Sequence, residues 1–374
     1  MTQYFSIIKT SPLDSNEFDS TREAARKILI LIHRGHSINQ VLERGLLPPT
    51  ETSSLILQMI TAGIIVPKPD QPTVTQQVQI VTDSAADLPK ELAEQLDILQ
   101  VPLQVRFGQT VFADGVDLDA QTFYRMLAAN QALPTTSPPS LDAFHRIFDQ
   151  VIGERDILCI HLSKRMSKTA DIAEQTIRKY FNAYLRKRKE GSRKENRFRI
   201  EVIDSKQVSM GTALLAIEAA ECARKGLKLE EIRDHILSIR DLVQVNFMVD
   251  KLDHLARGGR IGRGSAFLGN LFGLKPILNM TGGGVNAHSR SLGGRFAQRK
   301  LLQTMKQEIN PINHNTRIGI CHSASPEKAK TLEQMIEGVF PEISCITSDF
   351  GPTVGSHIGP GAVGVSWLSL PKQL

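Results

Sequence analysis

The sequence predicts an α/β protein with two α/β lobes, preceded by a small, mainly helical module. From Val78 to Ile203, short apolar runs end in hydroxyl-bearing loops, and each loop leads into an amphipathic segment. This alternation is typical of a parallel sheet covered by helices. A second set of apolar runs begins near Gln244. The 374 residues leave room for two or three domains with their own cores.

Residues 1–77 are predicted to form the helical module and its linker. Its expected elements are amphipathic helices at Thr21–His33, Ser37–Leu42 and Thr50–Ala62, and a strand at Gly63–Pro67. This order resembles a winged-helix module. The third helix lacks the Lys and Arg that a DNA-reading helix presents, so we expect a protein-binding or regulatory role. The stretch 67–77, rich in Pro, Gln and Thr, is a predicted hinge.

Residues 78–243 are predicted to form the first α/β lobe. The expected strands are Val78–Val81, Ile98–Val105, Ile157–Leu162 and Arg199–Ile203, with a turn at Phe112–Gly115 and helices opening at Pro89, Asp119, Ser140, Ala170 and Gln207. Polar loops follow three of these strands, at Asp83-Ser84, Ser163 and Asp204-Ser205. Because the carboxyl ends of parallel strands meet at one sheet edge, a ligand crevice is expected there. We interpret the two Asp-Ser pairs as caps and loop ties.

Residues 244–374 are predicted to form the second α/β lobe. Strands are expected at Val245–Val249, Lys275–Met280 and Ile318–Cys321, and a helix at Pro326–Gly338. The tail 350–364 carries too many glycines for a regular element, so its backbone is expected to bend tightly or to approach a neighbour closely.

The segment Leu133–Ser140 is predicted to be a stiff loop that opens a helix. Ser140 is a suitable N-cap, and the prolines restrict the approach. The hydroxyls of Thr136 and Ser137 would then lie beside the positive end of a helix, where an anion can bind. The alternative is a capped turn without a ligand.

Composition and charge exclude several classes of protein. The chain is 41% hydrophobic and 22% charged, and no apolar run approaches the ~18 residues of a membrane span. The first residues do not resemble a secretory signal, and the four cysteines lack the spacing of a zinc site or disulfide framework, so we expect a cytoplasmic protein. Residues 186–199 hold eight basic and two acidic residues, which equals the net charge of +6. The positive charge is thus confined to one short segment. This favours a solvated loop, or docking to an acidic partner or a membrane surface, over nucleic-acid binding.

Nine short motifs occur in one order along the chain. They are Thr82-Asp83-Ser84, Val101-Pro102-Leu103, Asp114, Thr136-Ser137-x-Pro139-Ser140, Ser163-x-x-Met166-Ser167-x-Thr169, Asp204-Ser205, Gly258-Gly259-Arg260, Lys275-Pro276-Ile277 and His357-x-Gly-Pro-Gly361. Together they resemble the DegV family, the fatty-acid-binding subunits of bacterial fatty acid kinase. The resemblance covers about residues 78–370.

The resemblance implies a long-chain fatty acid held between two lobes, with no other cofactor. A separate kinase catalytic subunit would phosphorylate its carboxylate with ATP. By motif, Thr136 and Ser137 would meet the carboxylate from one side and Ser167 from another. Arg260 and His357 would add positive charge or hydrogen-bond donors from the second lobe. Lys168 departs from the family, which usually has Gly there, and would either clash with the usual backbone path or add a cation.

These residue types suit a fatty acid. Burying a sixteen-carbon tail contributes about 10 kcal/mol before the costs of association. The desolvated carboxylate needs hydrogen-bonding partners, because a bare buried charge costs several kcal/mol. The apolar run 267–273 is either a wall for the tail or ordinary core.

Three other functions fit the sequence less well. A hydrolase would use Ser163 or Ser167 with His357 and Asp83, but no G-x-S-x-G elbow occurs. A nucleotide enzyme would use the glycines of 258–264, which lack the spacing of a phosphate loop. A lipid-responsive regulator would read DNA with the N-terminal module, which supplies no basic helix. We therefore expect a lipid-binding subunit that does not catalyse.

Overall fold

The computed structural model describes residues 5–7, 24–25, 27–28, 41, 47–61, 65–67, 76–129, 133–267, 274–309 and 315–370. The contacts of the chain separate two compact units, Met1–Val74 and Thr75–Leu374. In the part of the chain that is described, no helix is long and apolar enough to cross a membrane.

The described part of the first unit contains helix α3 (Pro49–Thr61) and strands β1 (Phe5–Ile7) and β2 (Ile65–Pro67), which pair antiparallel. The third predicted helix and the predicted strand are confirmed within two residues of their expected bounds. The pairing strand β1 was not predicted. Most of the first two predicted helices, and the hinge from residue 68 to 75, lie outside the described residues.

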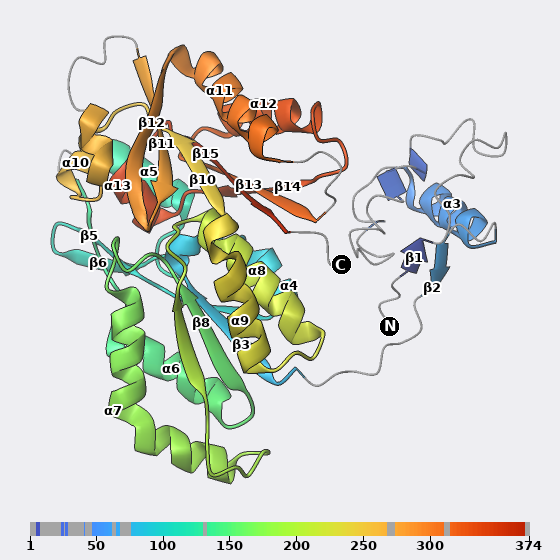
Figure 1. The fold of residues 1–374 in the computed structure, drawn as a ribbon, viewed down its shortest axis with the longest axis vertical. Helices are drawn as coiled ribbons and strands as arrows, with labels where there is room; N and C mark the ends of the chain where they lie inside the picture. The colour runs from blue at the N-terminus through green and yellow to red at the C-terminus, as the bar shows by residue number, and fades with distance from the viewer. Residues whose placement is uncertain are drawn as a thin grey trace. The chain divides into compact units, whose positions relative to one another are not determined.

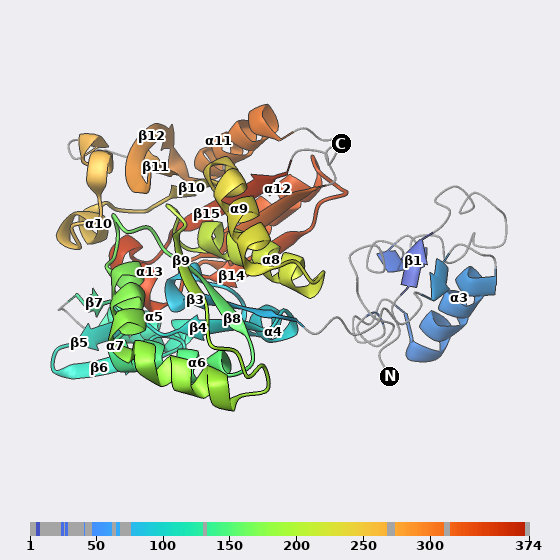
Figure 2. The ribbon, with the colours of Figure 1, turned by 60° about the horizontal axis from the view of Figure 1, so that its bottom comes forward.

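A four-stranded parallel sheet, in the order β4-β3-β8-β9, begins the second unit and confirms the predicted pattern. One face packs on α6 and α7 through Val81 and Cys159, and the other packs on α8 and α9 through Ile80 and Ile160 (Figures 1 and 2). Alternate side chains therefore serve opposite faces, as the pleat of a strand requires. The elements are β3 (Val78–Asp83), η3 (Ser84–Ala86), α4 (Lys90–Gln95), β4 (Ile98–Val101), α6 (Leu141–Ile152), β8 (Asp156–His161), α7 (Thr169–Glu190), β9 (Ile200–Asp204), α8 (Met210–Arg224) and α9 (Leu229–Ile239).

A small antiparallel sheet, in the order β6-β5-β7, differs from the sequence expectations at three points. It consists of β5 (Gln104–Phe107), β6 (Thr110–Ala113) and β7 (Thr135–Ser137), with α5 (Ala120–Ala129) packed nearby. The single strand predicted at Ile98–Val105 is two strands in two sheets, because Pro102 has no N–H to continue a ladder. The predicted loop at Thr136 is an edge strand paired with Val105. The predicted turn begins later, since Phe112 belongs to β6.

A six-stranded mixed sheet, in the order β12-β11-β10-β15-β13-β14, completes the second unit. Helix α8 packs between this sheet and the parallel sheet, and all its residues except Glu221 and Arg224 are buried. Most of its buried residues are apolar, because the helix has neighbours on several sides. The elements are η4 (Arg240–Leu242), β10 (Gln244–Met248), α10 (Asp253–Arg257), η5 (Gly262–Phe267), β11 (Leu274–Thr281), β12 (Gly284–Leu292), α11 (Gly293–Glu308), β13 (Thr316–His322), α12 (Pro326–Glu337), β14 (Cys345–Asp349), α13 (Pro352–Ile358) and β15 (Val363–Ser369).

The glycine-rich tail is regular, which corrects the sequence expectation. It forms helix α13 and the start of β15. Gly355 lets α13 approach α5 closely, since a Cβ at that position would overlap Tyr124 and Phe123. Gly359 and Gly361 have φ of +71° and +86° and turn the chain from helix to strand. The expected close approach and tight bend are both present, but within a helix and at its end.

Two buried carboxylates hold the N-terminal end of α13. Asp87 Oδ1 accepts a hydrogen bond from the Gly351 amide at 2.8 Å, and Asp114 Oδ2 accepts one from the Thr353 amide at 3.2 Å. Asp114 also accepts from the Ser84 hydroxyl at 2.9 Å. These oxygens satisfy amides that lack partners within the helix. Burial raises the pKa of both carboxyl groups, that of Asp87 well above its usual value.

We expect Asp87→Ala to lower the free energy of unfolding by about 1–3 kcal/mol, because the half-buried Gly351 amide loses its acceptor. Asp87→Asn keeps an acceptor oxygen and should lose less. Since the pKa of Asp87 is raised in the folded state, the native protein should lose stability relative to Asp87→Asn as pH rises above about 4. Urea denaturation at a series of pH values measures the stability of the native protein and of both variants. Equal losses in Asp87→Ala and Asp87→Asn would contradict the role of the acceptor, and a pH-independent difference between the native protein and Asp87→Asn would contradict the raised pKa.

Candidate functional site

A cavity lies at the carboxyl ends of β3, β8 and β9, where the predicted crevice was expected. The loops after these strands meet the small sheet and α13 there, and the cavity has a volume of about 70 Å³. The residues that line it are Ala85, Leu103, Thr136, Ser137, Pro138, Leu162, Met166, Ser167, Val208, Phe247, Leu255, Arg260, Val285, Thr353, Val354, His357 and Ile358.

All five residues that the sequence analysis selected line this cavity. Thr136 and Ser137 come from β7, and Ser167 comes from the loop between β8 and α7. Arg260 follows α10, and His357 lies in α13. The fold therefore brings together polar groups from four separate elements, two of them 221 residues apart in the sequence.

Thr136 and His357 are in direct contact, with 2.8 Å between Thr136 Oγ1 and His357 Nε2. The imidazole packs against the end of α10, where Gly258 is required because a Cβ would overlap Nδ1. Nδ1 is buried and has no hydrogen-bond partner among the described residues. The imidazole is thus held by packing on one side and by Thr136 on the other.

His357 is neutral near pH 7. Burial lowers the pKa of the His357 imidazole to about 4, and the nearby Arg260 and His254 act in the same direction. Of the two roles that the sequence analysis left open for His357, the geometry favours the hydrogen-bond donor over the cation.

Arg260 joins the loop after β8 to the end of α10. Its Nε donates to the Met166 carbonyl at 3.2 Å, and its Nη1 donates to the Gly258 carbonyl at 2.7 Å. Both acceptors are uncharged, so these bonds leave the guanidinium charge beside the cavity without neutralising it. Neither of these two contacts is a salt bridge.

Ser167, Ser137 and the neighbouring Lys168 differ in their exposure and in their hydrogen-bond partners. Ser167 Oγ shares a 2.8 Å hydrogen bond with Thr169 Oγ1 and is half-buried. Ser137 is exposed at the rim, where its hydroxyl donates to Gln104 Oε1 at 3.1 Å. Lys168 is also exposed, and its φ of −86° is open to any residue, so lysine there causes no backbone clash.

The other end of the cavity is apolar. A second cavity of about 30 Å³ shares four lining residues with the first, namely Val208, Phe247, Val354 and Ile358. It extends toward Ser209, Val245, Cys321, Phe350, Gly364 and Ser366. A polar, cationic end therefore continues into an apolar one, which suits a long amphiphilic anion. The proposed wall at 267–273 cannot be placed, since the side chain of Phe267 and residues 268–273 lie outside the described residues.

The Asp-Ser pairs tie loops together, as predicted. Asp83 Oδ2 accepts from the Leu162 amide at 2.9 Å and contacts His161 Nδ1 at 3.0 Å. Asp204 Oδ1 accepts from the amides of Lys164 and Lys206. Asp83 is thus paired with a different histidine from the one in the cavity, which argues against the Ser–His–Asp set of the hydrolase alternative.

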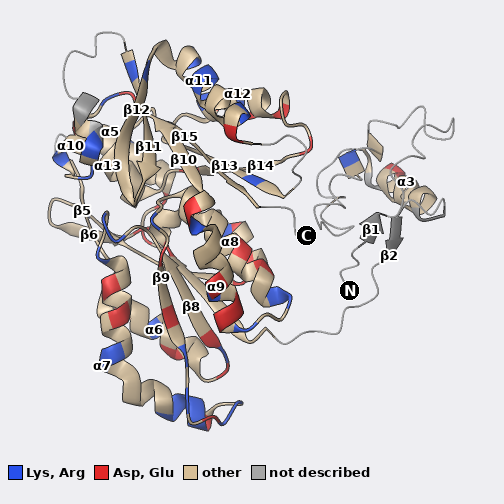
Figure 3. Cartoon of the chain, viewed as in Figure 1, with Lys and Arg blue, Asp and Glu red and all other residues tan. Residues whose placement is uncertain are grey.

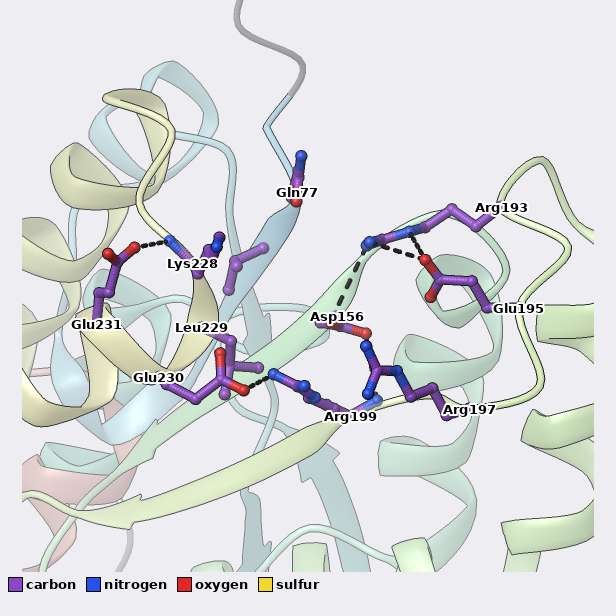
Figure 4. Close-up of a pocket in the computed structure, with 11 residues that line it drawn as sticks. Gln77, Asp156, Arg193, Glu195, Arg197, Arg199, Lys228, Leu229, Glu230 and Glu231 are labelled. Atoms are coloured by element: carbon purple, nitrogen blue, oxygen red, sulfur yellow. Dashed lines mark hydrogen bonds and ion pairs between the residues drawn. The ribbon is translucent and has the colours of Figure 1, made fainter.

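A larger cavity, of about 500 Å³, lies near the amino ends of β3 and β8 and contains none of the selected residues. Its charges pair with one another, as between Arg193 and Glu195 and between Arg199 and Glu230 (Figure 4). Most of the basic segment 186–199 lies at the end of α7 and in the loop that follows (Figure 3). Arg188 of this segment is buried against Asp156. These pairs neutralise part of the basic segment, so we interpret this cavity as a structural feature.

Sequence reasoning missed the apolar lining of the cavity that holds the five selected residues. Val208, Phe247, Val354 and Ile358 separate the two cavities, yet in the sequence they resemble ordinary core positions. The position of Val208 just after β9 was the one available signal, because the crevice of a parallel sheet forms at that end.

Comparison with known proteins gives one consistent result. The model of the family described as "Uncharacterised protein, DegV family" matches residues 77–370. A DegV domain-containing protein of Halalkalibacterium halodurans is 30% identical over 295 residues, which cover 78% of this chain and 98% of that protein.

Solved structures agree with the sequence match. A fatty-acid-binding DegV family protein from Thermus thermophilus has a TM-score of 0.70 and 28% identity, over 79% of this chain and 100% of that one. DegV from Bacillus subtilis, a fatty acid binding protein, has a TM-score of 0.68 and 27% identity, over 79% of this chain and 99% of that one.

We expect the His357 imidazole to titrate near pH 4, because its buried position disfavours the charged form. Since this pKa lies below the value of about 6.5 in the unfolded chain, the native protein should lose stability relative to His357→Gln as pH falls through that interval. NMR titration of the histidine rings measures the pKa, and urea denaturation measures the stability. A ring pKa near 6.5 would show that the imidazole is solvated.

Proposed function

Because the chain belongs to the DegV family, we propose that it binds one long-chain fatty acid in the cavity between the small sheet, the loop after β8 and α13. The observation that carries this proposal is the two-ended cavity. Hydroxyls, an imidazole and a guanidinium gather at one end, and the other end continues into an apolar cavity. The solved relatives from Thermus thermophilus and Bacillus subtilis, whose names describe fatty-acid binding, support the same ligand class.

The carboxylate would be held by a short chain of hydrogen bonds. Neutral His357 can donate from Nε2 to Thr136 Oγ1, which turns the Thr136 hydroxyl proton toward the ligand. Ser167 can donate a second hydrogen bond, and Arg260 supplies the opposite charge. A desolvated carboxylate then keeps donors and a counter-charge, which removes most of the cost of its burial.

The tail would extend toward the second cavity. Each buried methylene contributes about 0.8 kcal/mol, so the tail supplies most of the affinity. The cavity lined by Thr136 and His357 and its apolar neighbour, at about 70 and 30 Å³, are smaller than the roughly 300 Å³ of typical ligand sites. Val208 and Phe247 line both cavities, so we propose that their side chains move when the tail enters.

We further propose that the protein presents the carboxylate to a separate kinase subunit. Ser137 and Lys168 are exposed near the polar end, so this end lies closer to solvent than the apolar one. In the reaction, a carboxylate oxygen attacks the γ-phosphorus of ATP, ADP leaves, and an acyl phosphate forms. The chain itself would bind without catalysing, which agrees with the pairing of Asp83 with His161.

We prefer this role to that of a DNA-reading regulator. Helix α3, PTETSSLILQMIT, has one acidic residue and neither Lys nor Arg, so it lacks the charges that contact phosphates. The protein-binding or regulatory role expected for residues 1–77 stays a prediction.

We expect the purified chain to carry, or to take up from added palmitate or oleate, one fatty acid per chain. Native mass spectrometry, followed by denaturing extraction, measures the increment and identifies the lipid. Thr136→Val removes the hydroxyl at nearly constant volume and should weaken binding by about tenfold, since a hydrogen bond to a charged group contributes about 1.5 kcal/mol or more. Thr110→Val, on the exposed edge of the same small sheet, is the matched control and should bind normally.

A chain that stays free of lipid with either fatty acid would overturn the binding proposal. The kinase proposal is tested separately. Lipid-loaded protein, ATP and a fatty acid kinase catalytic subunit should yield acyl phosphate, trapped by hydroxylamine. Normal lipid binding without acyl phosphate would reject the kinase role alone.

A further inference from the structure

A cluster of metal-binding side chains lies outside the fatty-acid cavity, between α8 and α9. Glu218 and Cys222 are four residues apart on α8 and therefore share one face of that helix. His235 faces them from α9, which lies beside α8 in both ribbon views (Figures 1 and 2). One ligand atom from each of the three residues lies within 4.8 Å of the other two.

One oxygen of Glu218 lies between the other two ligands. Its Oε1 is 2.9 Å from His235 Nε2 and 3.9 Å from Cys222 Sγ. The ligands of a tetrahedral zinc ion, bound at about 2.0–2.3 Å, are roughly 3.3–3.7 Å apart. The two distances from Glu218 Oε1 lie just above and just below this range, so small side-chain shifts would place the carboxylate, thiolate and imidazole around a zinc ion.

The second oxygen of Glu218 is held from behind. Arg317 of β13 places Nη1 2.8 Å from Glu218 Oε2, and its Nη2 pairs with Glu221 at 2.6 Å. Oε1 is left to face the thiol and the imidazole. Such outer contacts orient ligands in metal sites. The Arg317 charge is balanced by Glu221, and a zinc ion would be balanced by one thiolate and one carboxylate.

The cluster can be reached from solvent on one side. Glu218 and Cys222 are buried, whereas the His235 side chain is 32% exposed. An ion could enter past the imidazole, with the outer position completed by water. Helix α8 packs between the parallel and mixed sheets. An ion bound here would therefore fix α9 to the helix that contacts both sheets.

We propose that Glu218, Cys222 and His235 form a zinc site that fastens α9 to α8. The mixed thiolate, imidazole and carboxylate donors favour Zn²⁺ over Mg²⁺ or Ca²⁺, which prefer oxygen ligands. The cysteine spacing in the sequence argued against zinc, because it lacks a C-x-x-C pair. Tertiary packing, rather than local spacing, assembles these ligands.

Titration of the full chain with Co²⁺ tests the proposal, after reduction and removal of metals with a chelator. We expect a thiolate-to-cobalt charge-transfer band that saturates at one Co²⁺ per chain and disappears when Zn²⁺ is added. Cys222→Ser should abolish the band. His235→Gln, at a partly exposed position, should weaken Co²⁺ binding by at least about tenfold.

Cys345→Ser, which changes a thiol on β14, is the matched control and should keep the band. Melting curves without metal establish that each variant is folded. The absence of a saturable band, its survival in Cys222→Ser, or its loss in Cys345→Ser would overturn the proposal. The cluster would then be a structural contact in which Arg317 pairs with Glu218 and His235 is hydrogen-bonded to it.

Discussion

Two buried carboxylates at the start of α13 are the contacts on which the cavity depends. Asp87 binds the amide of Gly351, 264 residues further along the chain, and Asp114 binds the amide of Thr353. Together with the glycine that lets α13 approach α5, these bonds fix a short helix against the small sheet. His357, near the end of that helix, can then reach Thr136. Burial of two ionisable groups is the cost of this placement, visible in their raised pKa values.

Residues of helix α13 line both the polar and the apolar end of the cavity. His357 belongs to the polar end, while Val354 and Ile358 face both the main cavity and its apolar continuation. A carboxylate and a hydrocarbon tail make opposite demands, since the first needs donors and charge and the second needs the absence of water. One helix that presents a polar residue and two apolar ones can meet both demands.

The sequence could predict what local patterns encode. The parallel strands, their polar loops and the Ser140 cap follow from periodicity and capping, and all are present. The split of the predicted strand at Pro102 follows from a local feature, the missing N–H, that the sequence does contain. The regular path of the tail depends on tertiary partners, above all Tyr124, which local patterns do not reveal. Motif resemblance selected five polar residues that line one cavity, but not the apolar residues, because Val208 and Phe247 have no feature that separates a tunnel wall from a core.

The most direct test of this account is carbon-13 NMR of carboxyl-labelled palmitate added to the full chain. The account predicts one carboxyl resonance in slow exchange that remains ionised through neutral pH, because Arg260 and the Thr136 hydroxyl favour the charged form. The chemical shift of this carboxyl resonance should change in the variant Thr136→Val. A carboxyl signal that titrates as it does for free palmitate, unchanged by that substitution, would place the head group in solvent and contradict the site.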